Sequence, residues 1–134
     1  MIVVDTNVVA YFLIESDLSP LATSVHEVDS FWAAPLVWRS EMRSVLAGYL
    51  KRGLMSLDTA KEYMSEAHLL LNDHEHHVES GRVLELAALS GCTAYDCEFV
   101  YLAEKLGLQL VTSDKEILKA FPSIAISMSD FIAA

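Results

Sequence analysis

The alternation of apolar and polar residues along the chain predicts short strands separated by helices. Residues 2–4 form a continuous apolar run typical of a buried parallel strand, and residues 6–14 can follow it as a helix. Residues 31–34 and 108–112 read as two further strands, and residues 124–126 as a last short one. The pattern therefore indicates at least four strands spread over the whole length of the chain.

Helical spacing and helix-end signals predict the segments between these strands. Gly53 and Gly107 each follow a helical segment, where glycine ends a helix because it readily adopts a left-handed conformation. The polar residues 72–77 predict a loop or weak strand ending at Val78. The predicted helices cover residues 20–28, 35–52, 95–106 and 114–120, together with one that Ser56 or Asp58 caps and that extends to about Leu71, and one that ends near Ser90.

Strands that alternate with helices imply a three-layer α/β/α sandwich around a mainly parallel central sheet. The 134 residues fit one domain, spanning residues 1–134, and no linker-like stretch divides them. The longest apolar run, residues 8–14, is far below the roughly 20 residues of a membrane span. The start of the chain also lacks the basic flank of a signal peptide, so we expect a soluble cytoplasmic protein without a membrane partner.

Charge narrows the possible partners. Nine Lys and Arg against nineteen Asp and Glu leave a formal net charge of −10, which argues against a general affinity for polyanions. A nucleic-acid substrate would need local positive charge or bound cations.

Several residues with potential chemistry are expected to belong to the core. Cys92 and Cys97 are too few for a disulfide framework or a zinc site, which predicts two buried thiols. Apolar neighbours favour core packing over base stacking for four aromatic residues, Trp32, Trp38, Phe99 and Tyr101.

Four acidic residues occupy positions that do not suit a solvated surface. Asp5 directly follows the first strand and Asp114 follows residues 108–112, so both should lie at carboxyl ends of parallel strands, where such sheets bind ligands. Asp96 begins a stripe of apolar residues at helical spacing, and Glu41 lies beside the apolar stripe of its own helix. The sequence thus predicts four carboxylates directed towards one edge of the sheet.

Clustered carboxylates repel one another, and their burial without compensation costs several kcal/mol or raises their pKa values. A bound divalent cation removes this conflict. Oxygen-only ligands suit Mg²⁺ or Mn²⁺ better than zinc. Such an ion lowers the pKa of a bound water and neutralises a scissile phosphate, so the residues predict metal-assisted phosphodiester hydrolysis with one or two ions.

The order and spacing of these acids resemble a protein family. The motifs are Val3-Val4-Asp5-Thr6-Asn7, Glu41 in the helix after the second strand, Thr93-Ala94-Tyr95-Asp96 and Thr112-Ser113-Asp114. Together they are similar to a PIN domain, and the resemblance covers nearly the whole chain. A single-domain chain of this size is most similar to the VapC-type toxins of toxin–antitoxin pairs, which are endoribonucleases dependent on Mg²⁺ or Mn²⁺.

The resemblance implies roles for individual residues. Asp5, Glu41 and Asp96 become metal-site carboxylates, and Asp114 a fourth that binds a second ion or orients water, with a helix N-cap as its alternative. Supporting roles fall to two hydroxyls, Thr6 and Ser113, which could hold a carboxylate or a metal-bound water or could instead cap the following helices.

Partners follow from the same resemblance, which implies an RNA substrate, a homodimer and a small antitoxin that wraps over the helices. Arg39 and Arg43, one turn apart on the helix of Glu41, could grip RNA phosphates or form an ordinary solvated face. The apolar first and second helices are expected to leave surface for association.

Two other functions stay open on the sequence. One is a PIN-like binding module without catalysis, because a chain can keep all four acids and still not catalyse a reaction. The other is a Mg-dependent phosphatase of haloacid dehalogenase type, which also carries an Asp after its first strand. That reaction requires a second Asp two positions later to protonate the leaving group, and this chain has Asn7 there.

Overall fold

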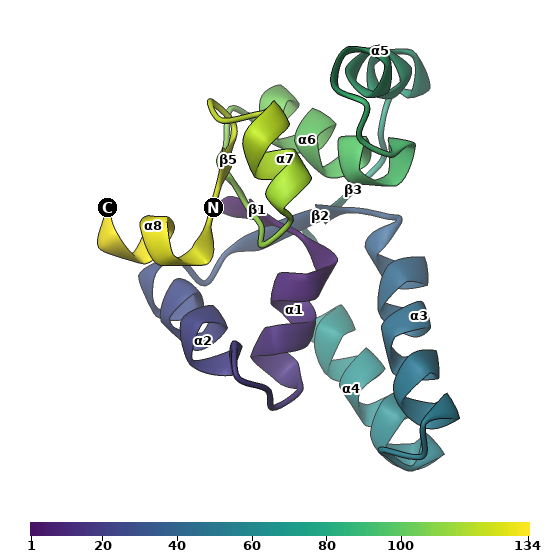
Figure 1. Ribbon diagram of the computed structural model, residues 1–134. Coiled ribbons are helices and arrows are strands. Elements are labelled where there is room, and N and C mark those ends of the chain that lie inside the picture. The colour runs from purple at the N-terminus through teal and green to yellow at the C-terminus, as the bar shows by residue number, and fades with distance from the viewer.

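Five short strands form one parallel sheet at the centre of the protein. The computed structural model describes all residues 1–134, and the strands lie in the order β3-β2-β1-β4-β5, with every neighbouring pair parallel (Figure 1). The predicted, mainly parallel sheet is therefore confirmed. The strands are β1 (Ile2–Val4), β2 (Trp32–Pro35), β3 (Glu75–His76), β4 (Leu110–Val111) and β5 (Ala125–Ile126).

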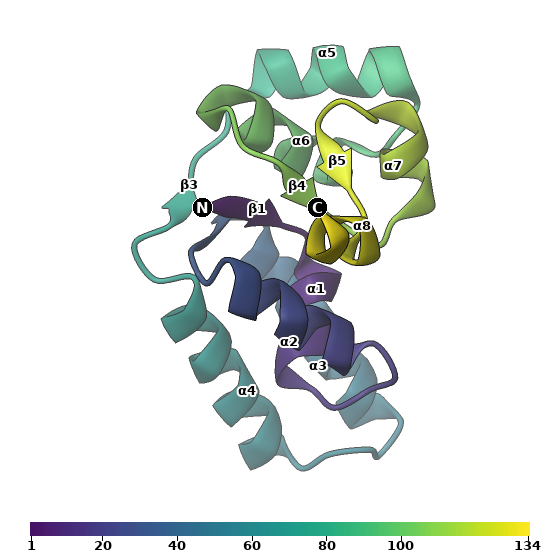
Figure 2. The same ribbon diagram turned by 90° about the vertical axis from the view of Figure 1, so that its left-hand side faces the viewer.

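Helices cover both faces of this sheet, which makes the expected three-layer α/β/α sandwich. The helices are α1 (Thr6–Leu13), α2 (Ser19–Val28), α3 (Trp38–Lys51), α4 (Leu57–Leu70), α5 (Ser80–Ser90), α6 (Ala94–Leu106), α7 (Lys115–Ala120) and α8 (Met128–Ala133). One face carries α5, α6 and α7, and α1 to α4 lie on the other, as both views show (Figures 1 and 2). None of the helices combines the length and hydrophobicity needed to cross a membrane.

The central strand β1 sets the position of the site. Val3 pairs with Ala33 of β2 on one side and with Leu110 of β4 on the other. Val4 pairs with Val111, and both side chains are fully buried. Because the strands are parallel, the residues that follow β1 and β4 emerge side by side at one edge of the sheet.

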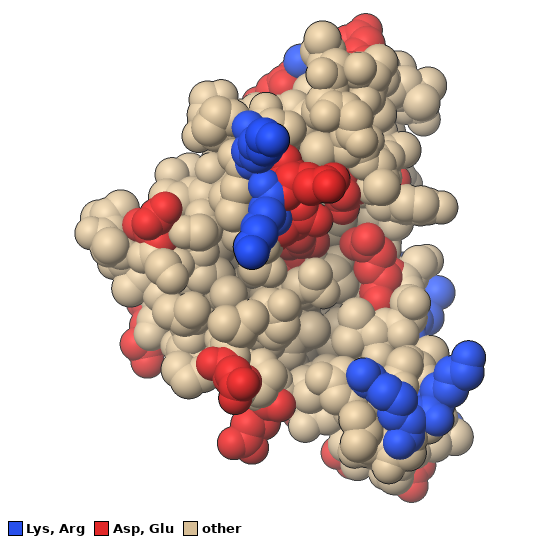
Figure 3. Space-filling view, in the orientation of Figure 1, with Lys and Arg blue, Asp and Glu red and all other residues tan.

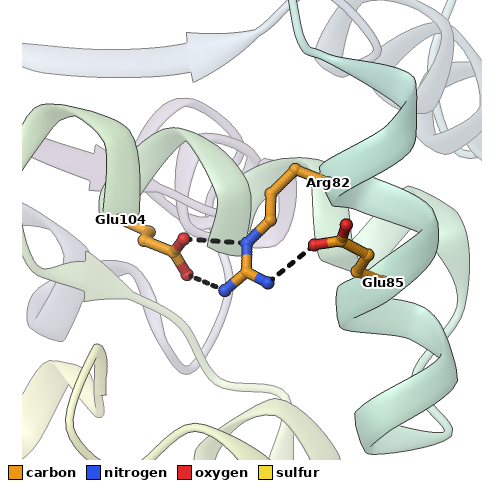
Figure 4. Close-up of polar contacts among 3 residues, drawn as sticks. All are labelled: Arg82, Glu85 and Glu104. Atoms are coloured by element: carbon orange, nitrogen blue, oxygen red, sulfur yellow. Dashed lines mark hydrogen bonds and ion pairs between the residues drawn. The ribbon is translucent and has the colours of Figure 1, made fainter.

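Helix α6 covers one face of the sheet and is itself covered by α5. Phe99 and Val100 of α6 are buried in the core. The Arg82 guanidinium of α5 donates to both carboxylate oxygens of Glu104 on α6, at 2.9 and 3.0 Å, and to Glu85 at 3.0 Å (Figure 4). The four aromatic residues expected in the core are buried, and both cysteines are buried free thiols, as predicted.

Helix α1 is largely buried over its first half, and Tyr11, Phe12 and Leu13 in its second half stay half-buried. It packs against α2, α3 and α4, and its residues Val8 and Val9 are completely buried. Large exposed apolar side chains lie on α4 and α5, among them Leu69, Leu84 and Leu89, and Val28 at the end of α2 is exposed as well.

Two elements differ from the sequence prediction by more than two residues. Helix α3 starts at Trp38 rather than at Pro35, because Pro35 still belongs to β2 and pairs with His76 of β3. Helix α8 was not predicted, and it begins after Ser127, whose hydroxyl accepts the Asp130 N–H at 3.1 Å.

Candidate active site

A pocket of about 310 Å³ opens at the edge of the sheet where β1 and β4 end. Four of its lining residues are the acids predicted from the sequence, and no Lys, Arg or His lines it. Acidic side chains gather there on the molecular surface, between α7 and the start of α3 (Figure 3). The lining residues are Asp5, Thr6, Asn7, Glu41, Ser44, Val45, Asp96 and Asp114.

Asp5 is the most deeply placed of these acids, with 7% of its surface exposed. Its backbone N–H donates to the carbonyl oxygen of Val111 at 3.1 Å, which fixes the residue directly after the strand pair. The Thr112 hydroxyl donates to Asp5 Oδ2 at 2.8 Å. Burial raises the pKa of Asp5, the carboxylates of Asp96 and Asp114 raise it further, and the bond from Thr112 opposes them.

Glu41 reaches the pocket from the first turn of α3. The Thr6 hydroxyl donates to Glu41 Oε1 at 2.7 Å, so the start of α1 holds a carboxylate of α3. Burial raises the pKa of Glu41, and the negative charges of Asp5 and Asp96 add to the shift. Thr6 therefore orients a carboxylate, which is one of the two roles predicted for it.

Asp96 enters from the first turn of α6 and is half-buried. Its backbone N–H donates to the Thr93 hydroxyl at 3.1 Å, and this N-cap fixes the start of the helix. Burial raises the pKa of Asp96, and the charges of Asp114 and Glu116 raise it further.

Asp114 both caps a helix and lines the pocket, so the two predicted alternatives occur together. Its Oδ1 accepts the N–H groups of Glu116 and Ile117 at 2.8 and 3.1 Å, which caps α7. Its Oδ2 makes no hydrogen bond within the chain. That second oxygen is therefore free to contact a molecule in the pocket.

Sequence reasoning missed Thr112, which joins two of the acids. Besides donating to Asp5, its hydroxyl accepts the backbone N–H of Asp114 at 3.0 Å, and its side chain is fully buried. A signal for it existed, because Thr112 is the first residue after β4, as Asp5 is after β1. Ser113 does not line the pocket, and no side-chain hydrogen bond supports the role predicted for it.

Comparison with known proteins settles the family. The sequence matches the PIN domain family over residues 2–122. The chain belongs to the PIN domain family. The resemblance stated from the motifs is thus confirmed, and with it the fold.

Individual relatives of this PIN domain are more distant. Ribonuclease VapC3 of Pyrobaculum aerophilum is 28% identical over 127 residues, which span 92% of this chain and 96% of that protein. The crystal structure of PAE2754 from Pyrobaculum aerophilum superposes with a TM-score of 0.76 at 21% identity, covering 98% of this chain and 92% of that one. A toxin-antitoxin complex from Klebsiella pneumoniae gives a TM-score of 0.68 at 18% identity, covering 96% and 98%.

The basic residues predicted to contact RNA lie outside the acidic pocket of this PIN domain. Arg39 donates from Nε to Glu75 Oε2 at 2.6 Å and from Nη2 to Oε1 at 2.7 Å, so it is bound to β3. Arg43 is exposed beside Lys61, on the side of α3 that faces α4. The basic side chains beside the acidic patch lie over α7, which carries Lys115 and Lys119 (Figure 3).

The donor set of the PIN domain fits a hard divalent cation. No three His, Cys, Asp or Glu side chains converge closely enough to form a complete ligand set in advance. The pocket nevertheless offers only oxygen ligands from its acids, and it contains no basic side chain to balance them. Burial and the neighbouring carboxylates raise the pKa values of Asp5, Glu41 and Asp96. A bound cation would stabilise their charged forms.

Proposed function

We propose that this PIN domain is a divalent-metal-dependent endoribonuclease and the toxin of a toxin–antitoxin pair. The observation that carries the proposal is the meeting of Asp5, Glu41, Asp96 and Asp114 in one pocket without a basic side chain. The similarity to Ribonuclease VapC3 supports RNA as the substrate. The fold shared with a protein of a toxin-antitoxin complex fits the proposed pairing.

In this proposal Asp5, Glu41 and Asp96 would hold Mg²⁺ or Mn²⁺, and Asp114 would hold a second ion or orient the attacking water. A bound divalent ion would neutralise the scissile phosphate and lower the pKa of water. Thr112 and Thr6 keep Asp5 and Glu41 in fixed orientations through their hydroxyls. The free Oδ2 of Asp114 can accept a hydrogen bond from water that attacks in line with the leaving oxygen.

A protein partner is part of the same proposal. The net charge of −10 favours a small cationic antitoxin, because opposite charges steer association. Exposed leucines on α4 and α5, such as Leu69 and Leu89, offer apolar surface for the antitoxin or for a second copy in a homodimer.

Removing one carboxylate tests the reaction. Asp5→Asn and Asp96→Asn are each expected to lower the rate of RNA cleavage in Mn²⁺ by about 100-fold or more, because a group that stabilises charge in the transition state is lost. The matched control is Asp17→Asn, an exposed acid outside the pocket, which should cleave at the rate of the unchanged protein. Circular dichroism should show the same helix content in all three variants.

Metal binding is measured separately by calorimetric titration of Mn²⁺, alongside a panel of structured RNAs. Saturable binding that Asp96→Asn weakens would support the assigned site. Full activity in EDTA would refute metal dependence. A protein that binds no metal and cleaves no RNA would instead be a PIN-like module that acts only through its partners.

A further inference from the structure

An exposed aromatic ring stands at the rim of the acidic pocket. Tyr95 lies in the first turn of α6, directly before Asp96, and 62% of its surface is exposed. Most aromatic residues of the chain are buried or half-buried, and only Phe31 is exposed to a similar extent, at 61%. Phe31 precedes β2, at the opposite edge of the sheet, and its ring contacts that of His74.

Tyr95 faces a second hollow that continues the acidic pocket. This hollow has a volume of about 380 Å³, and its lining residues are Val37, Ser40, Glu41, Ser44 and Tyr95. Two of them, Glu41 and Ser44, also line the acidic pocket, so the two spaces share a wall. Apart from Glu41, the second hollow is bounded by an aromatic ring, an aliphatic side chain and two hydroxyls.

These surfaces differ in the chemistry that they suit. The acidic pocket is built for a cation and, through it, a phosphate. The neighbouring hollow is poor in charge and presents a π face together with small hydroxyls, which suits a planar ring with polar edges rather than a phosphate. A nucleotide joined to the scissile phosphate would place its base beside that phosphate.

We propose that Tyr95 stacks on an unpaired nucleobase adjacent to the scissile phosphate, with Ser40 and Ser44 beside the edge of that base. This proposal rests on the proposed ribonuclease function and adds to it a binding residue outside the acidic pocket, the ring that holds the base next to the cut. A base within a duplex has both faces covered by its neighbours, and only a splayed base can stack on a protein ring. Stacking on an aromatic ring is tolerant of base identity, so Tyr95 favours unpaired RNA without selecting one base.

Replacing the ring tests the proposal. Tyr95→Leu is expected to raise KM for a single-stranded RNA about tenfold, within the 5- to 150-fold that one stacked base contributes, while kcat changes less than about twofold. Tyr95→Phe keeps the ring and should recover most of the lost affinity. Phe31→Leu, the matched exposed aromatic on the opposite edge, should leave KM unchanged.

Binding is measured independently of cleavage by fluorescence anisotropy in Mg²⁺, with every variant placed in the Asp5→Asn background. A set of oligonucleotides, each with one abasic position, locates the stacked base. At that position the loss from the missing base and the loss from Tyr95→Leu should not add, because both remove the same contact. At all other positions the two losses should add.

The outcomes separate this proposal from the ribonuclease function. Equal affinities of Tyr95→Leu and the unchanged chain, or additive losses at every abasic position, would overturn the stacking site. Failure of the chain to bind single-stranded RNA would overturn it as well. Ring-dependent binding by a chain that cleaves no RNA would contradict the nuclease function and still support the base site.

Discussion

At the scale of single residues, one hydroxyl connects two acids of the pocket. Thr112 donates to Asp5 Oδ2 and accepts from the backbone N–H of Asp114, and its side chain is fully buried. One hydroxyl therefore fixes the orientation of the carboxylate that follows β1 and the start of the turn before α7. Groups that orient a ligating carboxylate in this way commonly matter almost as much as the carboxylate itself.

Thr112→Val keeps the shape of the side chain and removes the hydroxyl. We expect RNA cleavage to fall by about 10- to 100-fold, the usual cost of losing an outer partner of a metal ligand. The free energy of unfolding should fall by about 1–3 kcal/mol, because the Asp114 N–H loses its acceptor. Steady-state kinetics and urea denaturation measure the two effects.

Thr112→Ser is the control, since it retains the donor and the acceptor. If Thr112→Val cleaved RNA at the same rate as Thr112→Ser, the hydrogen bond from Thr112 to Asp5 would not be needed for the reaction.

The four acids were predicted from the sequence, and Thr112 and Tyr95 were missed, for physical reasons. A carboxylate after an apolar strand conflicts with its surroundings, and this conflict is visible in the sequence. The place of Thr112 after a strand is visible in the sequence, but its partner is not, because only the pairing of Val4 with Val111 brings it to Asp5. Tyr95 carries no periodic signal, because an exposed ring in a first helical turn does not interrupt the pattern.

At the scale of elements, the edge strand β3 is held to α3 by side chains. Glu75 of β3 accepts from the Trp38 indole N–H at 2.6 Å and from Arg39 at 2.6 and 2.7 Å. The bonds from Arg39 lower the pKa of Glu75, and the Trp38 bond lowers it further against an opposing effect of burial. These contacts fix the start of the helix that carries Glu41.

The lowered pKa of Glu75 predicts how this contact depends on pH. Its stabilisation is fully present above the ordinary glutamate pKa of about 4.3, and it is lost as pH falls through the lowered value of the folded state. Glu75→Gln should therefore reduce the free energy of unfolding at pH 7, and only modestly, because the Arg39 side chain is exposed and water screens the pair.

The comparison is made by urea denaturation at pH 7 and near pH 3. The difference between Glu75→Gln and the unchanged chain should shrink as pH is lowered, because protonation of Glu75 in the folded state removes the charge that Arg39 stabilises. A difference of equal size at both pH values would show that the charge of Glu75 contributes nothing.

Elements with strong local signals in the sequence were predicted, whereas the short elements β3 and α8 have weak signals. Gly53 and Gly107 have the positive φ angles, 67° and 66°, that their positions after helices predicted. Strand β3 has only two residues and forms because β2 offers it a free edge. Helix α8 has six residues, too few for a clear period, and depends on its contact with α2.

At the scale of the whole molecule, charge is distributed unevenly over an acidic chain. The net charge is −10, yet basic side chains lie over α7 beside the acidic pocket (Figure 3). Another basic group lies over the far end of α3, which carries Lys51. If the substrate is RNA, as proposed, these positive charges of α7 would offset part of the repulsion between its phosphates and the acids.

Lys115→Ala and Lys119→Ala, each in the Asp5→Asn background, should weaken binding of single-stranded RNA and reduce the slope of log affinity against log salt by up to about one per lost phosphate contact. Arg43→Ala is the comparison, because Arg43 belongs to the pair predicted from the sequence and lies away from the pocket. Anisotropy at several salt concentrations measures all three. A change in slope for Arg43→Ala alone would place the RNA over α3 instead.

The overall architecture could be predicted because it depends on the alternation of apolar strands and amphipathic helices, which the sequence displays directly. The sequence did not predict which residues of each helix are buried, because burial depends on elements that are distant along the chain. Helix α1 looks apolar along its whole length, yet its contacts with α2, α3 and α4 bury Val8 and Val9 and leave Tyr11, Phe12 and Leu13 half-buried.

The divided use of Asp114 has a consequence for motion. Its Oδ1 closes the first turn of α7, and the same carboxyl group lines the pocket, so we expect a ligand bound to this carboxylate to change the stability of that turn. The backbone N–H groups of Glu116 and Ile117, which donate to this carboxylate, should therefore respond to binding. Hydrogen–deuterium exchange at these two amides, measured with and without a ligand, would detect binding in the pocket although neither residue lines it.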